Sequence, residues 1–163
     1  PDVTTPATID AFMPAIDAAI AHGGILGLHE YANPTLQCGF DAASGEGWFT
    51  GRYRKYYRDF LIPQNRSLPL VISETGIDNA CGTANLGGWR KYCAGPWHTP
   101  DASQCAGNYL AQLQWYDGLL QGDDYVLGAT IFQLEIPNWQ DYSVAGPFMD
   151  QLAAYMNNST RGA

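Results

Sequence analysis

The chain has 163 residues, of which 46% are hydrophobic and 15% are charged, a balance that is typical of a globular domain and excludes a disordered chain. Its formal net charge of −8 disfavours nucleic acid as a partner, because phosphate would be repelled. No run of about 18 apolar residues is present, so we expect no membrane-spanning segment. We expect one domain over residues 1–163. Because the chain begins at Pro1, without Met or a leader, we interpret it as a processed or trimmed product.

The first predicted elements are a helix and a buried strand. Apolar residues recur at helical spacing from Thr5 to about Ala21, and the glycines that follow end the helix. The run Ile25–Leu28 shows no polar alternation, which is typical of a strand buried on both faces. It leads into His29-Glu30-Tyr31, and residues 32–47 are predicted to form a loop.

The middle of the chain repeats this order. Residues 52–61 are predicted to form an amphipathic helix that ends at Pro63, with Tyr53, Tyr56 and Tyr57 in the core. The basic residues of that helix are expected on a solvated face, with Arg52 as the one expected to turn inward. Pro69–Ile72 is predicted as the second buried strand, and it leads into Ser73-Glu-Thr-Gly76.

The last third contains a long loop at 77–103, a helix at 105–120, a strand at 125–134 and a helix at 146–155. Helices therefore separate three strands. This order predicts an α/β fold with right-handed βαβ units and a parallel sheet.

Four cysteines, Cys38, Cys81, Cys93 and Cys105, contain no C-x-x-C pair, so a zinc site is not expected. Their even number favours two disulfides and an oxidising compartment, although all three connectivities and four free thiols remain open. N-glycosylation sequons begin at Asn65, Asn157 and Asn158. These features favour a secreted, extracellular protein, and we expect no metal or cofactor.

Polar side chains follow each predicted strand. Ligands of parallel α/β folds bind at the carboxyl ends of the strands, so these side chains are expected to converge at one site. They are His29, Glu30, Tyr31, Glu74, Gln133 and Glu135.

Two of these strand ends resemble a known family. Ile72-Ser-Glu-Thr-Gly76 resembles the seventh strand of clan A glycoside hydrolases, which are (β/α)8-barrel enzymes, and His29-Glu-Tyr31 is similar to the His-x-Tyr signature of their sixth strand. The resemblance is to secreted, fungal-like members. It implies a TIM-type barrel that is incomplete, with about three strands and four helices. Strands one to five and the Asn-Glu pair that carries the acid/base are not in the sequence.

The resemblance implies roles for the site residues. Glu74 would be the nucleophile of a retaining mechanism, Tyr31 would hold its carboxylate by a hydrogen bond, and His29 would contact substrate hydroxyls or the acid. Trp139 would stack on a sugar ring. Glu30 is a possible acid/base, although side-chain alternation argues that it points away from Glu74. The remaining expected substrate-binding residues are Gln133, Glu135 and Arg52.

Two functions remain open. The first is a glycoside hydrolase that cleaves a polysaccharide or oligosaccharide, completed by a missing amino-terminal half or by a homo-oligomer partner. The second is a lectin-like or defensive protein that binds carbohydrate without hydrolysis. Both glutamates also have a possible structural role: Glu74 could cap a turn or pair with Arg52, and Glu30 could be an ion-pair partner on the helix side. Three tryptophans could stack on sugar or pack against disulfides, namely Trp89, Trp97 and Trp139.

Overall fold

A three-stranded parallel sheet forms the centre of the protein. The structure is a computed structural model that describes residues 6–78, 81, 87–93 and 102–159. Strand β4 lies between the other two, and all three are parallel, which confirms the predicted α/β class. The strands are β1 (Leu26–Ala32), β4 (Leu70–Ile77) and β5 (Val126–Ile131).

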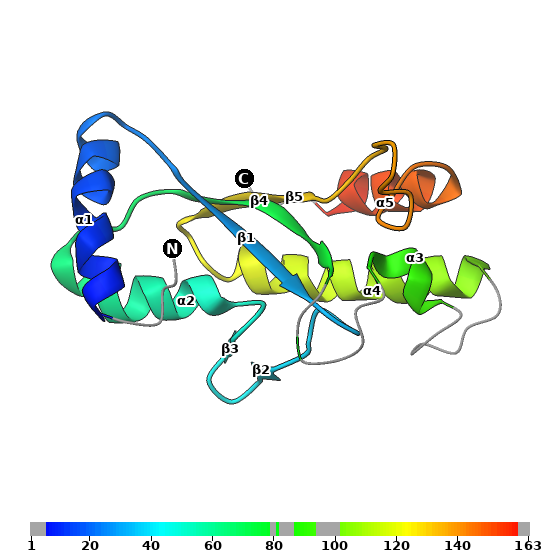
Figure 1. The fold of residues 1–163 in the computed structure, drawn as a ribbon, viewed down its shortest axis with the longest axis horizontal. Helices are drawn as coiled ribbons and strands as arrows, with labels where there is room; N and C mark the ends of the chain where they lie inside the picture. Colours follow the sequence, from blue (N-terminus) through cyan, green and yellow to red (C-terminus); the bar gives the residue numbers. More distant parts are fainter. Residues whose placement is uncertain (1–5, 79–80, 82–86, 94–101, 160–163) are drawn as a thin grey trace.

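Four helices lie where the sequence predicts them, and α2 and α4 run along the same side of the sheet (Figure 1). The prediction that Pro63 ends the second helix is wrong, because a π-helical turn and a 3-10 turn continue α2 as far as Gln64. Proline fits the first positions of a new helical turn, where its missing N–H is not needed. The helices are α1 (Pro6–Ala21), α2 (Arg52–Tyr56), α4 (Ala102–Gln121) and α5 (Pro147–Asn158).

Two short elements occupy segments that the sequence analysis assigned to loops. Residues 32–47 contain a hairpin of β2 (Phe40–Asp41) and β3 (Glu46–Gly47). The segment 77–103 contains α3 (Trp89–Tyr92). Elements of two to four residues are too short to show a hydrophobic period, so the sequence offered no signal for them.

One face of the sheet is packed and the opposite face is exposed. Leu26, Glu30 and Ala32 of β1 are buried under the helices, whereas the alternate residues point away from them. The prediction that the strands are buried on both faces is therefore wrong. Glycines in the strands hide the alternation, and a Cβ built on Gly128 would meet nothing within 4 Å. We call the exposed side the open face, formed by Gly27, His29, Tyr31, Val71, Ser73, Glu74, Gly128 and Thr130.

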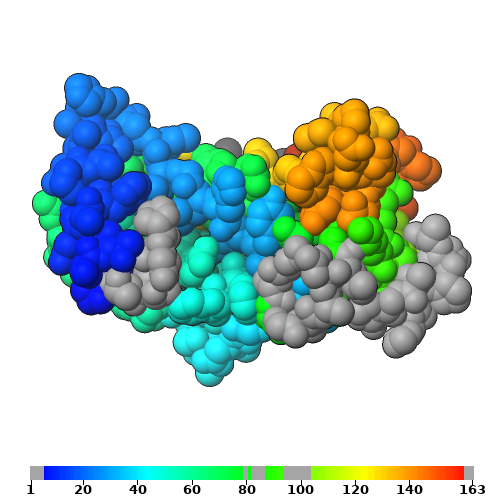
Figure 2. Space-filling model, viewed as in Figure 1, coloured from blue at the N-terminus to red at the C-terminus, as the bar shows by residue number. Residues whose placement is uncertain are grey.

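The surface is hollowed between α1, in blue, and the segment that follows β5, in orange (Figure 2). Directly after Ile72, strand β4 carries one extra residue relative to both neighbours. Leu28 of β1 pairs with Ile72, but the next residue of β1 pairs with Glu74, so Ser73 is a bulge. Ser73 Oγ donates a hydrogen bond to the Leu28 carbonyl (3.3 Å), and the Thr130 hydroxyl donates to the Ser73 carbonyl. The bulge shifts the alternation of side chains by one position.

Tyrosines fill much of the packed core. Tyr53, Tyr56 and Tyr57 are buried, as the sequence predicts, and Tyr57 stacks on Tyr125 with ring centroids 3.9 Å apart. Burial raises the pKa of Tyr57, so its hydroxyl remains protonated and donates to the Leu68 carbonyl (2.7 Å). The core is thus aromatic, and the Tyr57 hydroxyl bonds to backbone at its margin.

Glu30 is buried at the amino-terminal end of α2. Its carboxylate accepts hydrogen bonds from the N–H groups of Gly51 (2.7 Å) and Tyr53 (3.0 Å) and from the Tyr116 hydroxyl (2.7 Å). A carboxylate at a helix amino terminus satisfies N–H groups that have no partner within the helix. Glu30 therefore joins β1, α2 and α4.

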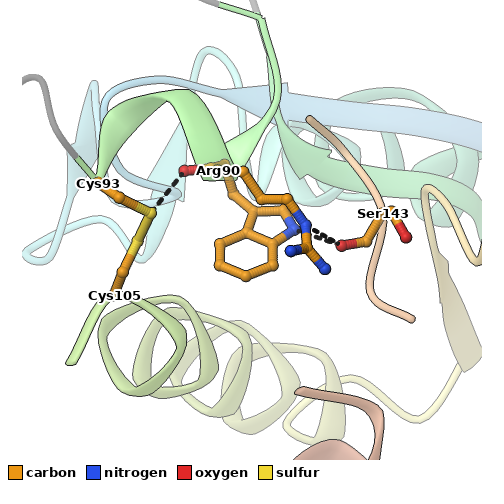
Figure 3. Close-up of a disulfide and its surroundings, with 5 residues drawn as sticks. Arg90, Cys93, Cys105 and Ser143 are labelled. Atoms are coloured by element: carbon orange, nitrogen blue, oxygen red, sulfur yellow. Dashed lines mark hydrogen bonds between the residues drawn. A yellow bond between two sulfur atoms is a disulfide. The ribbon is translucent and has the colours of Figure 1, made fainter. Parts of the chain in front are cut away.

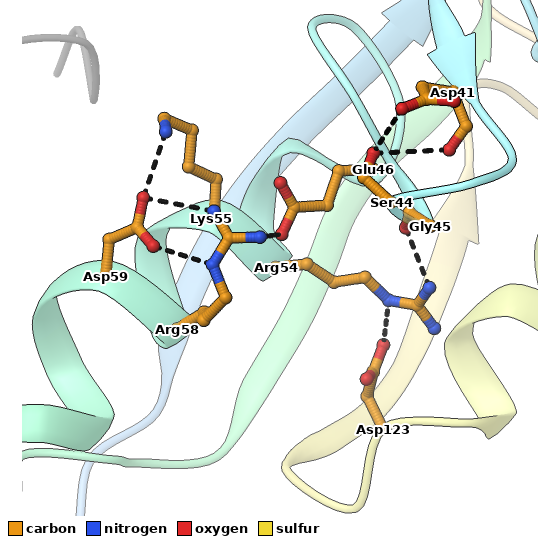
Figure 4. Close-up of polar contacts among 9 residues, drawn as sticks. All are labelled: Asp41, Ser44, Gly45, Glu46, Arg54, Lys55, Arg58, Asp59 and Asp123. Atoms are coloured by element: carbon orange, nitrogen blue, oxygen red, sulfur yellow. Dashed lines mark hydrogen bonds and ion pairs between the residues drawn. The ribbon is translucent and has the colours of Figure 1, made fainter.

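Arg54 connects three parts of the chain (Figure 4). Its guanidinium donates to the Asp123 carboxylate (2.6 Å) and to the carbonyls of Gly45 and Leu119 (both 2.8 Å). Tyr53 donates to the same carboxylate oxygen (2.6 Å). The expectation that Arg54 lies on a solvated face is therefore wrong, because its fork of N–H donors suits several fixed acceptors at once.

Lys55 and Arg58 lie on the surface as expected. Lys55 pairs with Asp59 (2.9 Å), and Arg58 contacts Asp59 and Glu46. Exposed pairs of this kind contribute little to stability.

Two disulfides are present, which settles the connectivity that the sequence left open. Cys38 pairs with Cys81 and Cys93 pairs with Cys105, with Cα atoms 6.2 and 5.3 Å apart. Closing chain segments of these lengths is worth roughly 3–4 kcal/mol through the entropy of the unfolded state. Within the described residues, no helix is long and apolar enough to cross a membrane.

We predict that Glu30 makes stability depend on pH. Burial raises the pKa of its carboxyl above the usual 4.5, against the hydrogen bonds that lower it. A group whose pKa is raised in the folded state contributes fully to the free energy of unfolding at pH values below its unfolded-state pKa. This contribution is lost as the pH rises through the folded-state pKa. The free energy of unfolding of wild type minus that of Glu30→Gln should therefore fall as the pH rises above about 4.5, measured by urea denaturation. A difference that rises with pH would contradict this.

We predict that Arg54→Ala lowers the free energy of unfolding by about 2–3 kcal/mol, because it leaves a half-buried carboxylate and two carbonyls without this donor. Lys55→Ala is the matched control, and it should cost less than about 0.5 kcal/mol because its ion pair is exposed. Urea denaturation of the two variants compares them directly, and equal losses would show that Arg54 has no connecting role.

Candidate functional site

Glu74 lies on the open face with two polar neighbours from β1. The Tyr31 hydroxyl donates a hydrogen bond to Glu74 Oε2 at 2.8 Å, and His29 Nδ1 lies 3.3 Å from the same oxygen. The Glu74 side chain is 38% exposed and that of His29 is 56% exposed. The hydrogen bond expected between Tyr31 and Glu74 is therefore present, and the carboxylate is held while it remains accessible.

The parallel register explains why these residues meet. His29 is the direct partner of Glu74 across the β1–β4 pair, and Tyr31 follows two residues later on the same face. Burial, and then the hydrogen bond to Glu74, raise the pKa of Tyr31 well above its ordinary value. Its hydroxyl therefore stays protonated and remains a donor to the carboxylate over the whole neutral range.

An aromatic cluster continues the site beyond Tyr31. The Tyr31 ring meets Phe132 edge-on with centroids 6.3 Å apart, and Phe132 meets Trp139 edge-on at 5.5 Å. Tyr142 packs against both, at 5.5 Å from Phe132 and 5.2 Å from Trp139. We call Phe132, Trp139 and Tyr142 the aromatic platform. Trp139 is 46% exposed, so one ring of the platform is available to a ligand.

Asp78, which directly follows β4, supports this platform. Its Oδ1 accepts a hydrogen bond from the Tyr142 hydroxyl at 2.6 Å. The sequence analysis did not select Asp78, Phe132 or Tyr142. Asp78 could have been found as a further polar residue at a strand end, whereas nothing in the sequence distinguishes the two aromatic rings from core residues.

The other predicted substrate-binding residues take different positions. Gln133 is buried, and its amide donates to the Trp139 carbonyl (2.9 Å), so it orders the loop. Glu135 is exposed on that loop. Arg52 lines a cavity of about 320 Å³ beside β1, together with His29 and Tyr56. Glu74 Oε2 contacts His29 Nδ1, and no ion pair between Glu74 and Arg52 is present in the described part of the chain.

Glu30 and Glu74 face opposite sides of the sheet. Glu30 pairs in register with Thr75, on the packed face, and its carboxylate is enclosed by three donors. The structure therefore does not bring Glu30 to the carboxylate of Glu74. These contacts fit the alternative in which Glu30 bonds to the helices that pack on the sheet. Its partners are backbone N–H groups and a tyrosine hydroxyl, whereas an ion pair was expected.

The remaining predicted residues are surface or packing groups. Asn65, Asn157 and Asn158 are exposed. Trp89 is buried near the Cys93–Cys105 disulfide, whereas Trp97 lies outside the described residues. In the described ranges, no group of three or more His, Cys, Asp or Glu side chains could hold a metal ion.

Comparison with protein-family models, with curated proteins and with solved structures gave no significant match.

Proposed function

We propose that this chain carries the nucleophile and part of the sugar-binding surface of a retaining glycoside hydrolase. The observation that supports this most is the accessible Glu74 carboxylate, which Tyr31 and His29 orient at 2.8 and 3.3 Å on the open face of a parallel sheet. The aromatic platform adjoins it through Phe132. An oriented carboxylate beside an exposed aromatic ring suits a sugar, whose C–H face stacks on the ring while its anomeric carbon meets the carboxylate.

In this proposal, Glu74 Oε1 or Oε2 attacks the anomeric carbon and forms a covalent ester as the glycosidic C–O bond breaks. An acid protonates the departing oxygen. Water then attacks the same carbon, the former acid takes a proton from that water, and Glu74 leaves. Tyr31 keeps the carboxylate in line during attack, and His29 is placed to contact hydroxyls of the same sugar.

The acid/base must come from outside the three strands, because Glu30 faces the packed side and retaining chemistry needs two carboxyl groups about 5–5.5 Å apart. In the described structure, β1 and β5 are the two edge strands of the sheet, so each has one side that pairs with no described strand. A parallel strand added beside β1 would lie two strand spacings, about 9.6 Å, from β4, so a long side chain on it can reach toward Glu74 across the open face. We infer that a longer form of the chain, or a partner, supplies that strand, and that the assembly completes a TIM-type barrel.

A second candidate is a carbohydrate-binding protein without hydrolysis. The observation that favours it is that none of the described hydrogen bonds or ion pairs joins Glu74 to a second carboxylate. Trp139 and His29 would still bind sugar in that case. We further propose that the protein is extracellular, which fits the two disulfides.

We predict that Glu74→Gln removes hydrolysis of the polysaccharide that the active assembly cleaves, with kcat reduced by about three orders of magnitude or more, because an amide cannot form the glycosyl ester. Glu46→Gln is the matched control, since that carboxylate lies in β3 and pairs with Arg58. Reducing-sugar release measures both. Retained activity in Glu74→Gln would refute the nucleophile role, whereas binding of saccharide by a wild-type assembly that never cleaves it would favour the second candidate.

We predict that Trp139→Ala weakens saccharide binding about tenfold, which is about 1.4 kcal/mol, because the stacking ring is lost. Trp48→Ala is the matched control, since Trp48 is 53% exposed and follows the β2–β3 hairpin. Isothermal titration with oligosaccharides of increasing length compares the two. Equal effects in both variants would show that Trp139 is not a sugar platform.

A further inference from the structure

The loop that carries Trp139 is bonded to α3, a helix that lies outside the open face. The Trp89 indole N–H donates to the Ser143 carbonyl (3.2 Å), and the Arg90 guanidinium donates to the same oxygen (2.8 Å) and to the Ala145 carbonyl (3.0 Å). Figure 3 shows the Arg90 side chain pointing at Ser143. Two side chains of one short helix thus hold the carboxyl-terminal side of the loop.

Asp141 provides a second set of contacts between the same segments. Its carboxylate accepts a hydrogen bond from the Gly88 N–H (2.6 Å) and lies 3.5 Å from Lys91 Nζ, and its carbonyl accepts from the Arg90 N–H (3.0 Å). A Cβ built on Gly88 would lie 2.3 Å from the Asp141 carbonyl oxygen. The two backbones therefore approach so closely that only glycine fits at this position.

Helix α3 is itself anchored in the protein. Cys93, directly after the helix, forms a disulfide with Cys105 near the start of α4. Trp89 is buried and stacks on Tyr109 and Phe148, with centroids 5.0 Å from each. A helix of four residues has no stability of its own, so its position depends on these anchors.

The loop also has bonds of its own to the end of β5. The Gln133 N–H and carbonyl bond to Tyr142 (3.4 Å) and Val144 (2.9 Å), and the Gln133 amide donates to the Trp139 carbonyl (2.9 Å). These bonds join the two ends of the loop, and the Tyr142 hydroxyl joins the loop to Asp78 after β4 (2.6 Å). Helix α3 adds a connection to α4, through the Cys93–Cys105 disulfide and through Trp89 on Tyr109.

We propose that α3, locked by the Cys93–Cys105 disulfide, is a clamp that positions the Trp139 loop and thereby sets the affinity of the aromatic platform for a sugar. Arg90 and Asp141 are positioning residues, because they act on the ligand through Trp139. The effect of the clamp on sugar binding rests on the proposed function, whereas its effect on the order of the loop does not. A pre-ordered loop has less entropy to lose on binding, so releasing the clamp lowers affinity while the Tyr31–Glu74 bond stays in place.

The first test needs no ligand. Hydrogen exchange of residues 133–145 is measured in the full chain for wild type, Arg90→Ala and Cys93→Ser/Cys105→Ser. Both variants should exchange faster in this segment, with β1 and β4 unchanged. Matched controls are Arg66→Ala, which removes an arginine that pairs with Asp17, and Cys38→Ser/Cys81→Ser, which removes the other disulfide. Unchanged exchange in 133–145, or an equal increase in the controls, overturns the clamp.

The second test uses the oligosaccharide that binds wild type. Arg90→Ala should weaken binding about tenfold and raise KM by the same factor with kcat changed less than about twofold, and Arg90→Lys should recover part of it. A fall in kcat without a change in KM would contradict the positioning role. If wild type binds no saccharide, the proposed function fails, and the exchange measurement alone then decides whether α3 orders the loop.

Discussion

One extra residue in the central strand turns Glu74 toward the open face. In a regular strand, Glu74 would share a side with Leu70 and Ile72, which are fully buried under the helices. The bulge at Ser73 is present relative to both neighbouring strands, because β4 has two residues between Ile72 and Thr75 where β5 has one. Hydrogen bonds from Ser73 to β1 and from Thr130 to Ser73 hold it. The pairing of Glu74 with His29 and Tyr31 exists only in this register.

Glu30 and Glu74 lie on neighbouring strands, and the face of the sheet on which each lies determines what its carboxylate can contact. Glu30 and Glu74 differ in register by one position, yet Glu30 is enclosed by donors of α2 and α4 and is fully buried. Glu74 has one hydroxyl and one imidazole as neighbours and remains accessible. The first carboxylate is buried with three donors around it and serves the fold, whereas the contacts of the second with Tyr31 and His29 are both at Oε2.

The aromatic platform depends on contacts that cross the whole protein. Tyr142 reaches Asp78 after β4, and the backbone beside Tyr142 is bonded to α3. Helix α3 is tied in turn to α4 by a disulfide and by Trp89 in the core. Without these contacts, a ring on a long loop would sample many positions. The position of the exposed Trp139 therefore depends on packed residues that do not themselves contact a ligand.

The sequence alone determined the order of helices and strands, their parallel arrangement and the buried tyrosines of α2, whereas the meeting of Tyr31 with Glu74 was expected only from the family resemblance. The first three follow from local periodicity or from strand order, which a single chain shows directly. The tertiary structure decided the bulge at Ser73, the open face, the pairing of the four cysteines and the clamp of α3 on the Trp139 loop. These depend on contacts between residues far apart in the chain, and short elements and single-residue shifts leave no period in the sequence from which such contacts could be predicted.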